Sequence, residues 1–577
     1  MTAVETRRLA TRMLVAAAAL FAVWSAWALV NVVLAGLDAR AGRDAAEQAR
    51  KDALGSLTSP DSIADLQRAQ AHFVSAHDRL SSVATLPVRL LPVFGRQVQS
   101  VDAVSVGAAR VAGVGADALT EVQDALVPEH ASGPARARLL RRMAEIATGA
   151  DQDLDDIRLG PGHLLGPVAD AQARLAKEVK GLREGLRRGA AGATAAADLL
   201  AGPRRYLILA ANNAEMRSGE GMILSAGLLE TKEGVLTVSP FRQTADLRLP
   251  PDAVPLEGDL ADRWGWLGPN QEWRNLGVSP RFDVTAPLAA RMWEAGGGGP
   301  VDGALMVDVA ALRALLKAVG PVTTEGRTVD ADTVEEQVLH GQYVEHAADP
   351  DQGARREELG SIAAAVVGAL QDRSWDASVL GQALGDAARG RHLLAWSAHP
   401  VEQQGWVAAG IDGSLRTDSL LVGALNRGAI KLDRFLGVRA SLEIRSDHGR
   451  AEGELRLRLR NDVPLGEPKY VAGPDPDSGA GEGVYVGIVA VTLPGYARNA
   501  RIDDVASLAV VGRDGPTRVV GSAVSIPRGA ERSLVVRFEV PNGTRELRVE
   551  PSARLPPIAW SSSGLHWRDD KSRTVSW

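Results

Sequence analysis

A long apolar run near the amino terminus constrains this chain more than any other feature of its sequence. Residues 13–35 read MLVAAAALFAVWSAWALVNVVLA, and only Ser25 and Asn31 in this run are polar. As a helix that rises about 1.5 Å per residue, the run covers roughly 34 Å, which exceeds the thickness of a hydrocarbon core of about 30 Å. The sequence therefore predicts a membrane-spanning helix at 13–35.

The charges on either side of the run predict its orientation. Arg7, Arg8 and Arg12 precede it against one acid, Glu5, whereas basic and acidic residues balance between 38 and 52. Because basic residues favour the cytoplasmic side, we expect 1–12 to be a cytoplasmic tail and the bulk of the chain to lie outside the plasma membrane, as in a single-pass protein. The alternative is a cleaved signal peptide, whose apolar core is usually only about 7 to 15 residues long.

The composition narrows the classes of function. The chain has 577 residues, so several folded units are expected. Its 65 basic residues are dispersed among 71 acidic ones, and a net charge of −6 does not favour nucleic acid as a partner. Cysteine is absent, which excludes disulfides, thiolate metal sites and thiol nucleophiles.

Residues 36–200 are predicted to form a helical stalk or bundle on the outer side of the membrane. Ser59, Pro60 and Asp61 combine a cap residue with a proline, which is typical of a helix start. Apolar residues then recur at steps of three and four from Ile63 to Leu80. Helices with such stripes pack as antiparallel neighbours. They serve either as a spacer or as a coiled coil that binds a partner.

The rest of the chain changes from helical to β-type patterns. Strand candidates at 205–210, 222–229, 235–239 and 304–307, with a helix at 309–319, predict an α/β central domain at 201–437. Period-two runs at 440–445, 451–461, 483–493, 517–525 and 533–540 predict an immunoglobulin-like β-sandwich at 438–555. Residues 556–577 are expected to be a polar tail. The predicted fold class is thus an α+β multidomain protein with a single transmembrane helix.

A polar segment directly after the first predicted strand of the central domain is a candidate ligand site. Residues 212–221 read NNAEMRSGEG, and loops at the carboxyl ends of strands are common binding sites in α/β sheets. Asn213, Glu215, Arg217 and Glu220 are the candidate residues. The same side chains are equally expected to satisfy buried backbone groups in a structural turn.

Four segments resemble the successive motifs of the bacterial family called domain of unknown function 4012. They are 206–221, 275–283 (NLGVSPRFD), 301–312 (VDGALMVDVAAL) and 391–397 (RHLLAWS). The family has no settled activity, and the resemblance implies a helical amino-terminal region behind a membrane anchor and a place in the cell envelope. Where the family usually has Gly-Gly after the arginine, this chain has Gly219, Glu220 and Gly221. This departure adds a carboxylate to the loop.

A weaker similarity links residues 217–356 to the LytR-CpsA-Psr family, enzymes that transfer lipid-linked glycopolymers to the cell wall. The order of motifs implies that Arg217, Arg242 and either Arg355 or Arg356 would clamp a pyrophosphate, with an acid holding magnesium. However, Gln243 stands where that family has an aspartate. Glu220 or Asp246 could supply a carboxylate, but neither occupies the expected position. The similarity therefore implies a shared fold more readily than a shared reaction.

Three hypotheses for function follow. The first is a noncatalytic envelope protein that binds a cell-wall glycopolymer or its lipid-linked precursor. The second is a LytR-CpsA-Psr-like glycopolymer phosphotransferase, for which magnesium would be the cofactor. The third is a noncatalytic scaffold whose helical region and sandwich bind other envelope proteins. The sequence leaves open whether the chain is an enzyme, which ligand it takes and whether it binds a metal.

Overall fold

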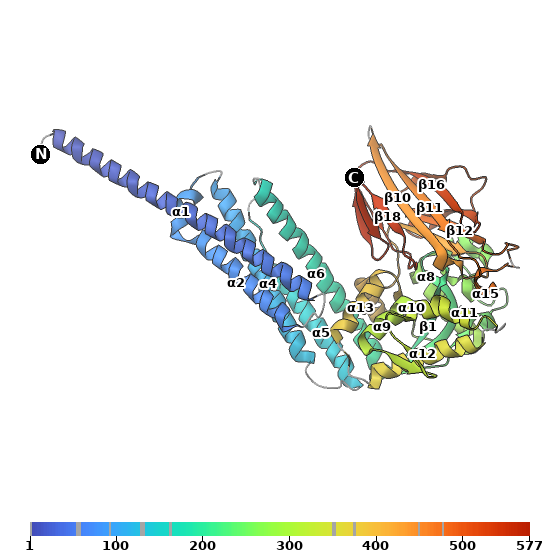
Figure 1. Ribbon diagram of the computed structural model, residues 1–577. Coiled ribbons are helices and arrows are strands. Elements are labelled where there is room, and N and C mark those ends of the chain that lie inside the picture. Colours follow the sequence, from blue (N-terminus) through green and yellow to red (C-terminus); the bar gives the residue numbers. More distant parts are fainter. Residues whose placement is uncertain are drawn as a thin grey trace. The chain divides into compact units, whose positions relative to one another are not determined.

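The fold is described from a computed structural model (Figure 1). It describes residues 3–53, 59–91, 94–126, 133–160, 164, 166–348, 353–372, 375, 377–447, 450–475 and 478–577, without the side chains of 3–22, 53, 354, 356, 377, 378, 446, 447 and 450. The chain divides into two compact units. Unit 1 comprises 1–129 and 139–193, and unit 2 comprises 130–138 and 194–577.

The helices of the amino-terminal region follow one another with short connections. They are α1 (Ala3–Ala53), α2 (Pro60–Ser81), η1 (Val83–Thr85), α3 (Leu86–Arg89), α4 (Phe94–Leu126), α5 (Pro134–Asp153) and α6 (Gly166–Ala201). As predicted, α2 begins at Pro60, and the side chain of Ser59 accepts a hydrogen bond from the amide of Ser62. Ile63 and Leu80 of the predicted stripe are buried. The helical character of this region is confirmed.

The prediction of a membrane-spanning helix at 13–35 was wrong, and with it the predicted plasma-membrane localisation and its cytoplasmic tail. The run lies within α1, where the side chains of 3–22 are outside the described residues. From residue 23, the helix stays uncharged only as far as Leu37, roughly 22 Å. Asp38 then pairs with Arg79 of α2, with 2.7 Å between Oδ2 and Nε. In the described part of the chain, no helix is long and apolar enough to cross a membrane.

The first half of unit 2 is built on a mixed sheet. Its strands are β1 (Arg204–Met216), β2 (Gly221–Lys232), β3 (Val235–Val238), β4 (Arg242–Gln243), β5 (Gly303–Val307) and β8 (Leu393–Ser397). The order is β3-β2-β1-β5-β8, with β4 beside β2. β1 and β5 are parallel, whereas β1 and β2, β2 and β3, and β5 and β8 are antiparallel. The sheet is therefore less parallel than the predicted alternation of strands and helices suggests.

Short helices and a small hairpin surround this sheet. They are η2 (Thr244–Leu247), α7 (Gly258–Trp264), η3 (Gly265–Leu267), η4 (Trp273–Val278), α8 (Phe282–Trp293), η5 (Glu294–Gly298), α9 (Val309–Val319), β6 (Val322–Thr324), β7 (Arg327–Val329), α10 (Val334–Glu336), η6 (Gln337–Gly341), α11 (Gln342–Glu345), α12 (Gly353–Asp372), α13 (Ala377–Arg389) and α14 (Pro400–Ala409). The helix predicted at 309–319 is α9, and Asp308 caps it by accepting hydrogen bonds from the amides of Ala310 and Ala311.

The carboxyl-terminal half of unit 2 is a sandwich of two six-stranded sheets. One has the order β13-β16-β11-β10-β18-β19 and the other β14-β15-β12-β9-β17-β20. The elements are β9 (Ser419–Asn426), η7 (Leu432–Phe435), β10 (Leu436–Asp447), β11 (Arg450–Asn461), α15 (Lys469–Ala472), β12 (Tyr485–Pro494), β13 (Arg498–Ile502), β14 (Val510–Asp514), β15 (Thr517–Ile526), β16 (Glu531–Val540), β17 (Glu546–Val549), β18 (Ala559–Ser562), β19 (Leu565–Arg568) and β20 (Arg573–Ser576).

Three features of this sandwich differ from the expected immunoglobulin-like sandwich with a polar tail. β9, which lies before residue 437, pairs with β12 inside the sandwich. Residues 556–577 contain β18, β19 and β20, and β18 adds to the sheet parallel to β10. The pair β17 and β9 is also parallel, whereas immunoglobulin sheets are antiparallel. The segment joins the sheets because its alternating residues include Trp560 and Val575, which the sandwich core buries.

Candidate functional site

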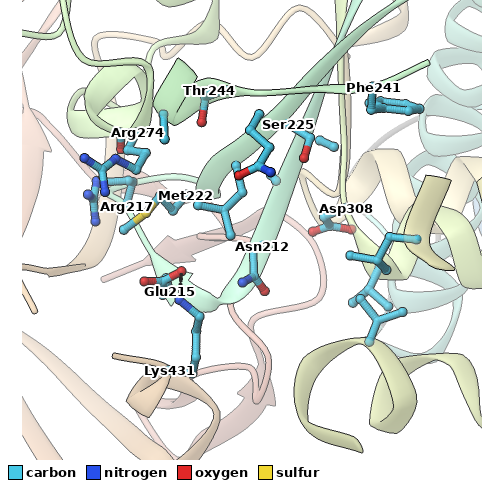
Figure 2. A pocket seen from close by; sticks show the side chains of 18 of the residues that line it. Asn212, Glu215, Arg217, Met222, Ser225, Phe241, Thr244, Arg274, Asp308 and Lys431 are labelled. Atoms are coloured by element: carbon cyan, nitrogen blue, oxygen red, sulfur yellow. Dashed lines mark hydrogen bonds and ion pairs between the residues drawn. The ribbon is translucent and has the colours of Figure 1, made fainter. Parts of the chain in front are cut away.

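A cavity of about 630 Å³ lies within unit 2, between the mixed sheet, the helices after β5 and the loop after β9. Its wall includes the carboxyl-terminal half of β1, α9, α12, the segment 427–431 and Tyr470 of α15. Figure 2 shows Glu215, Arg217, Arg274 and Lys431 toward one side of the cavity and Phe241 toward the other. The polar segment predicted as a ligand site therefore contributes directly to a cavity wall.

Six basic and three acidic side chains line the cavity among the residues that the structure describes. The basic residues are Arg217, Arg248, Arg274, Arg355, Arg427 and Lys431, and the acidic residues are Glu215, Glu272 and Asp308. Each acid is already engaged. Glu215 Oε2 lies 2.6 Å from Lys431 Nζ, Glu272 Oε2 lies 2.7 Å from Arg274 Nη2, and Asp308 Oδ2 lies 2.6 Å from His392 Nδ1. The cavity therefore has an excess of positive charge.

Arg217 is a buried cation that neutral groups hold in place. Its guanidinium donates to the carbonyl oxygens of Arg274, Met216 and Asn426 and to Oδ1 of Asn275. Burial lowers the pKa of Arg217 to about 10, while the charge of Glu215 opposes this shift. The side chain stays protonated at neutral pH, so it contributes positive potential to the cavity.

Lys431 and Arg355 lie against a pair of tyrosines. The rings of Tyr343 and Tyr470 are stacked with 5.7 Å between their centroids. Lys431 Nζ is 4.7 Å from the Tyr470 centroid, and Arg355 Cζ is 4.5 Å from that of Tyr343. Burial would lower the pKa of Lys431, but Glu215 and the two tyrosines hold it above its ordinary value. Lys431 is therefore a protonated, neutralised partner of Glu215.

Arg355 differs from Arg274 and Lys431 because no carboxylate of the described residues neutralises it. Its side chain is only 5% exposed. Among the described residues, none accepts a hydrogen bond from its buried Nε, and no carboxylate forms an ion pair with it. A buried guanidinium without such a partner is costly, and its planar fork suits a carboxylate or phosphate.

The other predicted site residues divide between the cavity and its surroundings. Asn213 faces away from the cavity and donates from Nδ2 to Asp308 and to the carbonyl of Ala553, both at 2.8 Å. Its neighbour Asn212 lines the cavity and donates to the hydroxyl of Tyr343 at 2.8 Å. This alternation is expected along a strand. The side chain of Arg356 lies outside the described residues.

Glu220 and Arg242 do not line the cavity. Glu220 is buried beside Gly277, where an added Cβ would lie 2.6 Å from Oε1. Burial raises the pKa of the Glu220 carboxyl to about 7, and Arg391 opposes part of this rise. Arg242 is exposed, with Cζ 5.7 Å from the ring centroid of Trp293. Phe241 and Gln243 on either side of Arg242 face the cavity instead.

Sequence reasoning missed Arg248, Arg274, Arg427, Lys431 and Tyr470. Lys431 meets Glu215 only because the chain returns from the sandwich to the end of β1, and no local pattern indicates such a contact. A detectable signal existed for Arg427 and Lys431. The buried run of β9 ends at Asn426, and the polar residues that follow occupy the same kind of strand end as the segment after β1.

Comparison with known proteins supports the resemblance to the domain of unknown function 4012 family. A family model described as protein of unknown function (DUF4012) matches residues 201–343. Residues 201–343 belong to the DUF4012 family. No curated protein and no solved structure matches the chain. The comparisons do not show the weaker similarity to LytR-CpsA-Psr proteins.

The DUF4012 region supplies only part of the cavity. Glu215, Arg217, Arg274, Asp308 and Tyr343 lie within the matched range, whereas Arg355, Arg427, Lys431 and Tyr470 come from residues beyond it. The described residues also contain no group of three or more His, Asp or Glu side chains that could hold a metal ion. The magnesium implied by the transferase resemblance thus has no fitting set of ligands among these side chains.

Proposed function

We propose that this chain is a noncatalytic binding protein for the lipid-linked precursor of a cell-wall glycopolymer, and that the cavity of unit 2 holds the ligand. The observation that carries this proposal is Arg355, a buried cation in the cavity wall that has no anionic partner among the described residues. An anionic ligand would supply that partner.

The excess of positive charge in the cavity favours a ligand with an anionic head group. Among the described side chains, no acid forms an ion pair with Arg217, Arg248, Arg355 or Arg427, although all four line the same cavity. Arg217 and Arg355 are buried, and their potential is the stronger for it, because the low dielectric screens charge less than water does, whereas Arg248 and Arg427 are exposed. A neutral sugar alone would leave these charges uncompensated, whereas a phosphate or diphosphate would not.

The residues of α12 that line the cavity favour a ligand with a hydrocarbon chain next to its anionic head group. Arg355, Leu359 and Ala363 lie four residues apart on one face of α12, and all three line the cavity. The stripe begins with a cation at the amino-terminal end of the helix, where the helix dipole also favours an anion. It continues with apolar groups over roughly two turns, about 11 Å. Leu312 and Val338 add to the same apolar wall.

The arrangement of arginines favours binding over the transferase hypothesis. That hypothesis requires Arg217, Arg242 and Arg355 to converge on one pyrophosphate. Arg217 and Arg355 line the cavity, but Arg242 is exposed and lies against Trp293. Gln243, which does line the cavity, cannot hold a cation as an aspartate would.

A calorimetric titration of the full chain with geranyl pyrophosphate tests the proposal. We expect binding in the absence of divalent cations, and weaker binding of inorganic pyrophosphate or of geraniol alone. Arg355→Gln should lower the affinity for geranyl pyrophosphate roughly thirtyfold or more, because it removes a desolvated charge from the complex.

Arg242→Gln is the matched control, because it removes the same charge outside the cavity. We expect it to change the affinity by less than about twofold. Equal losses in the two variants would contradict the proposed site. The absence of any heat of binding at millimolar ligand would contradict the function.

A further inference from the structure

A second positively charged surface lies on the outer face of the sheet β13-β16-β11-β10-β18-β19, away from the cavity lining. In the register of this sheet, Arg439 of β10 is directly opposite Arg458 of β11. On the other side, Arg439 pairs with Ala559 of β18, and Ala559 pairs with Arg568 of β19. All four residues are exposed. The three arginines therefore form one row across β19, β18, β10 and β11. Figure 1 shows the ribbons of β18, β10 and β11 in this layer.

We propose that this arginine row binds a linear acidic glycopolymer, at a site that is separate from the cavity and independent of the function proposed for it. Adjacent strands are about 4.8 Å apart, so Arg568 lies roughly 10 Å from Arg439 with only the methyl group of Ala559 between them. The small side chain between the two arginine positions favours close approach of a narrow polymer chain.

The charges of the row are not paired with acids. Two other arginines on this face do have acidic partners: Arg445 pairs with Glu443 at 2.7 Å and Arg501 with Glu452 at 3.6 Å. In the described part of the chain, no acid forms an ion pair with Arg439, Arg458 or Arg568. Like charges directly opposite each other on neighbouring strands are destabilising. An anion lying across the pair removes that repulsion.

The neighbouring rows favour a narrow ligand over a broad anionic surface. The next row along the strands carries the hydroxyls of Ser561 and Ser441, which can donate to a polysaccharide. The row after that places Glu443 opposite Glu454. Arginines already neutralise both acids, so a flat anionic membrane would gain little from this row, whereas a single chain needs only the unpaired arginine row.

The chemistry of the row also disfavours single-stranded nucleic acid. Sequence-tolerant binding of single strands relies on aromatic side chains on which bases stack. The arginine row, completed by Ala559 and by Ser533 opposite Arg458, contains no aromatic residue. Guanidinium and hydroxyl groups instead suit carboxylates or phosphates that repeat along a sugar chain.

Binding of the full chain to immobilised polygalacturonate tests this proposal. The double variant Arg439→Thr/Arg458→Thr should lower the affinity roughly tenfold, because two charge-assisted hydrogen bonds are lost. The matched control Arg445→Thr/Arg501→Thr makes the same change in net charge on the same face, and we expect less than about a twofold change. Raising the salt concentration should weaken binding of the unaltered protein.

Equal losses in the two double variants would overturn the proposal, since binding would then follow net charge alone. Tighter binding to a single-stranded oligonucleotide or to phosphatidylglycerol vesicles than to polygalacturonate would also overturn it. Both double variants change exposed side chains, and circular dichroism verifies that they remain folded. Geranyl pyrophosphate binding should be unchanged in both, so failure of this proposal and failure of the cavity proposal are distinguishable.

Discussion

At the scale of single residues, two buried arginines show how the same side chain can serve stability or binding. Arg217 is satisfied by three carbonyl oxygens and one side-chain amide oxygen, so it links β1 to η4 and to the end of β9. Arg355 has a tyrosine ring on one face and no carboxylate partner in the part of the chain that the structure describes. The first arginine holds the cavity wall together, and the second leaves its charge available to a ligand.

Replacing each arginine by methionine should therefore have opposite effects on stability. Arg355→Met removes an uncompensated buried charge, and we expect the free energy of unfolding without ligand to rise by about 1–3 kcal/mol. Arg217→Met leaves several carbonyl oxygens without donors, and we expect a decrease of about 3 kcal/mol. Urea denaturation of both variants measures these changes. A comparable loss of stability in Arg355→Met would contradict an Arg355 without a compensating partner.

Glu220 predicts a dependence of stability on pH. Burial raises the pKa of its carboxyl from an ordinary value of 4.5 to about 7. Between these values the folded state binds more protons than the unfolded state, so the free energy of unfolding falls as pH rises from about 4.5 to 7 and levels off above it. Glu220→Gln should remove this component, on the order of 3 kcal/mol.

Urea denaturation at pH 5 and pH 8 checks this expectation. The difference in stability between the two pH values should be smaller in Glu220→Gln than in the unaltered protein. The same difference in both proteins would mean that the Glu220 carboxyl is ionised in the folded state throughout this range.

At the scale of elements, local patterns predicted several of the longer helices and strands, but not the short elements between them and not which of their faces meet. The cap at Ser59 and the stripe after it predicted α2, and the strand–helix pattern at 304–319 predicted β5 and α9. The predicted arginine clamp failed at β4. This strand has only two residues, and its alternation turns Phe241 and Gln243 into the cavity and Arg242 outward. The sequence motif indicates that an arginine is present, but not the direction in which its side chain points.

The stripe on α12 predicts how a larger side chain at the apolar end of the cavity changes ligand binding. Ala363→Trp should block binding of geranyl pyrophosphate while leaving binding of inorganic pyrophosphate within about twofold, because Arg355 lies two turns away. Ala364→Trp adds the same ring to an exposed position of the same helix and is the matched control. Calorimetric titrations of both variants measure the effect. If Ala364→Trp impaired binding as much as Ala363→Trp, the hydrocarbon chain would not lie along this face.

At the scale of the whole molecule, the cavity depends on segments that are far apart in the sequence. The DUF4012 region provides β1 and the Tyr343 ring, and α12 provides Arg355. The sandwich half of unit 2 provides Arg427, Lys431 and Tyr470, which line the same cavity. The mixed sheet and the sandwich also share one apolar core, in which Leu425 and Ile488 pack with residues such as Leu207. The sequence pattern predicted a domain boundary at 437, but the cavity is lined by residues from both sides of this boundary. For this reason sequence patterns alone located only one side of the cavity.

Covalent mapping of the bound ligand tests the cavity proposal most directly. A benzophenone-bearing analogue of geranyl pyrophosphate is incubated with the full chain and irradiated, and the labelled peptides are identified by mass spectrometry. We expect labels on α9 and α12, near Leu312, Leu359 and Ala363, which disappear with excess geranyl pyrophosphate and in Arg355→Gln. Labels elsewhere, or labels on these helices that persist in Arg355→Gln, would contradict a site in which Arg355 holds the anion.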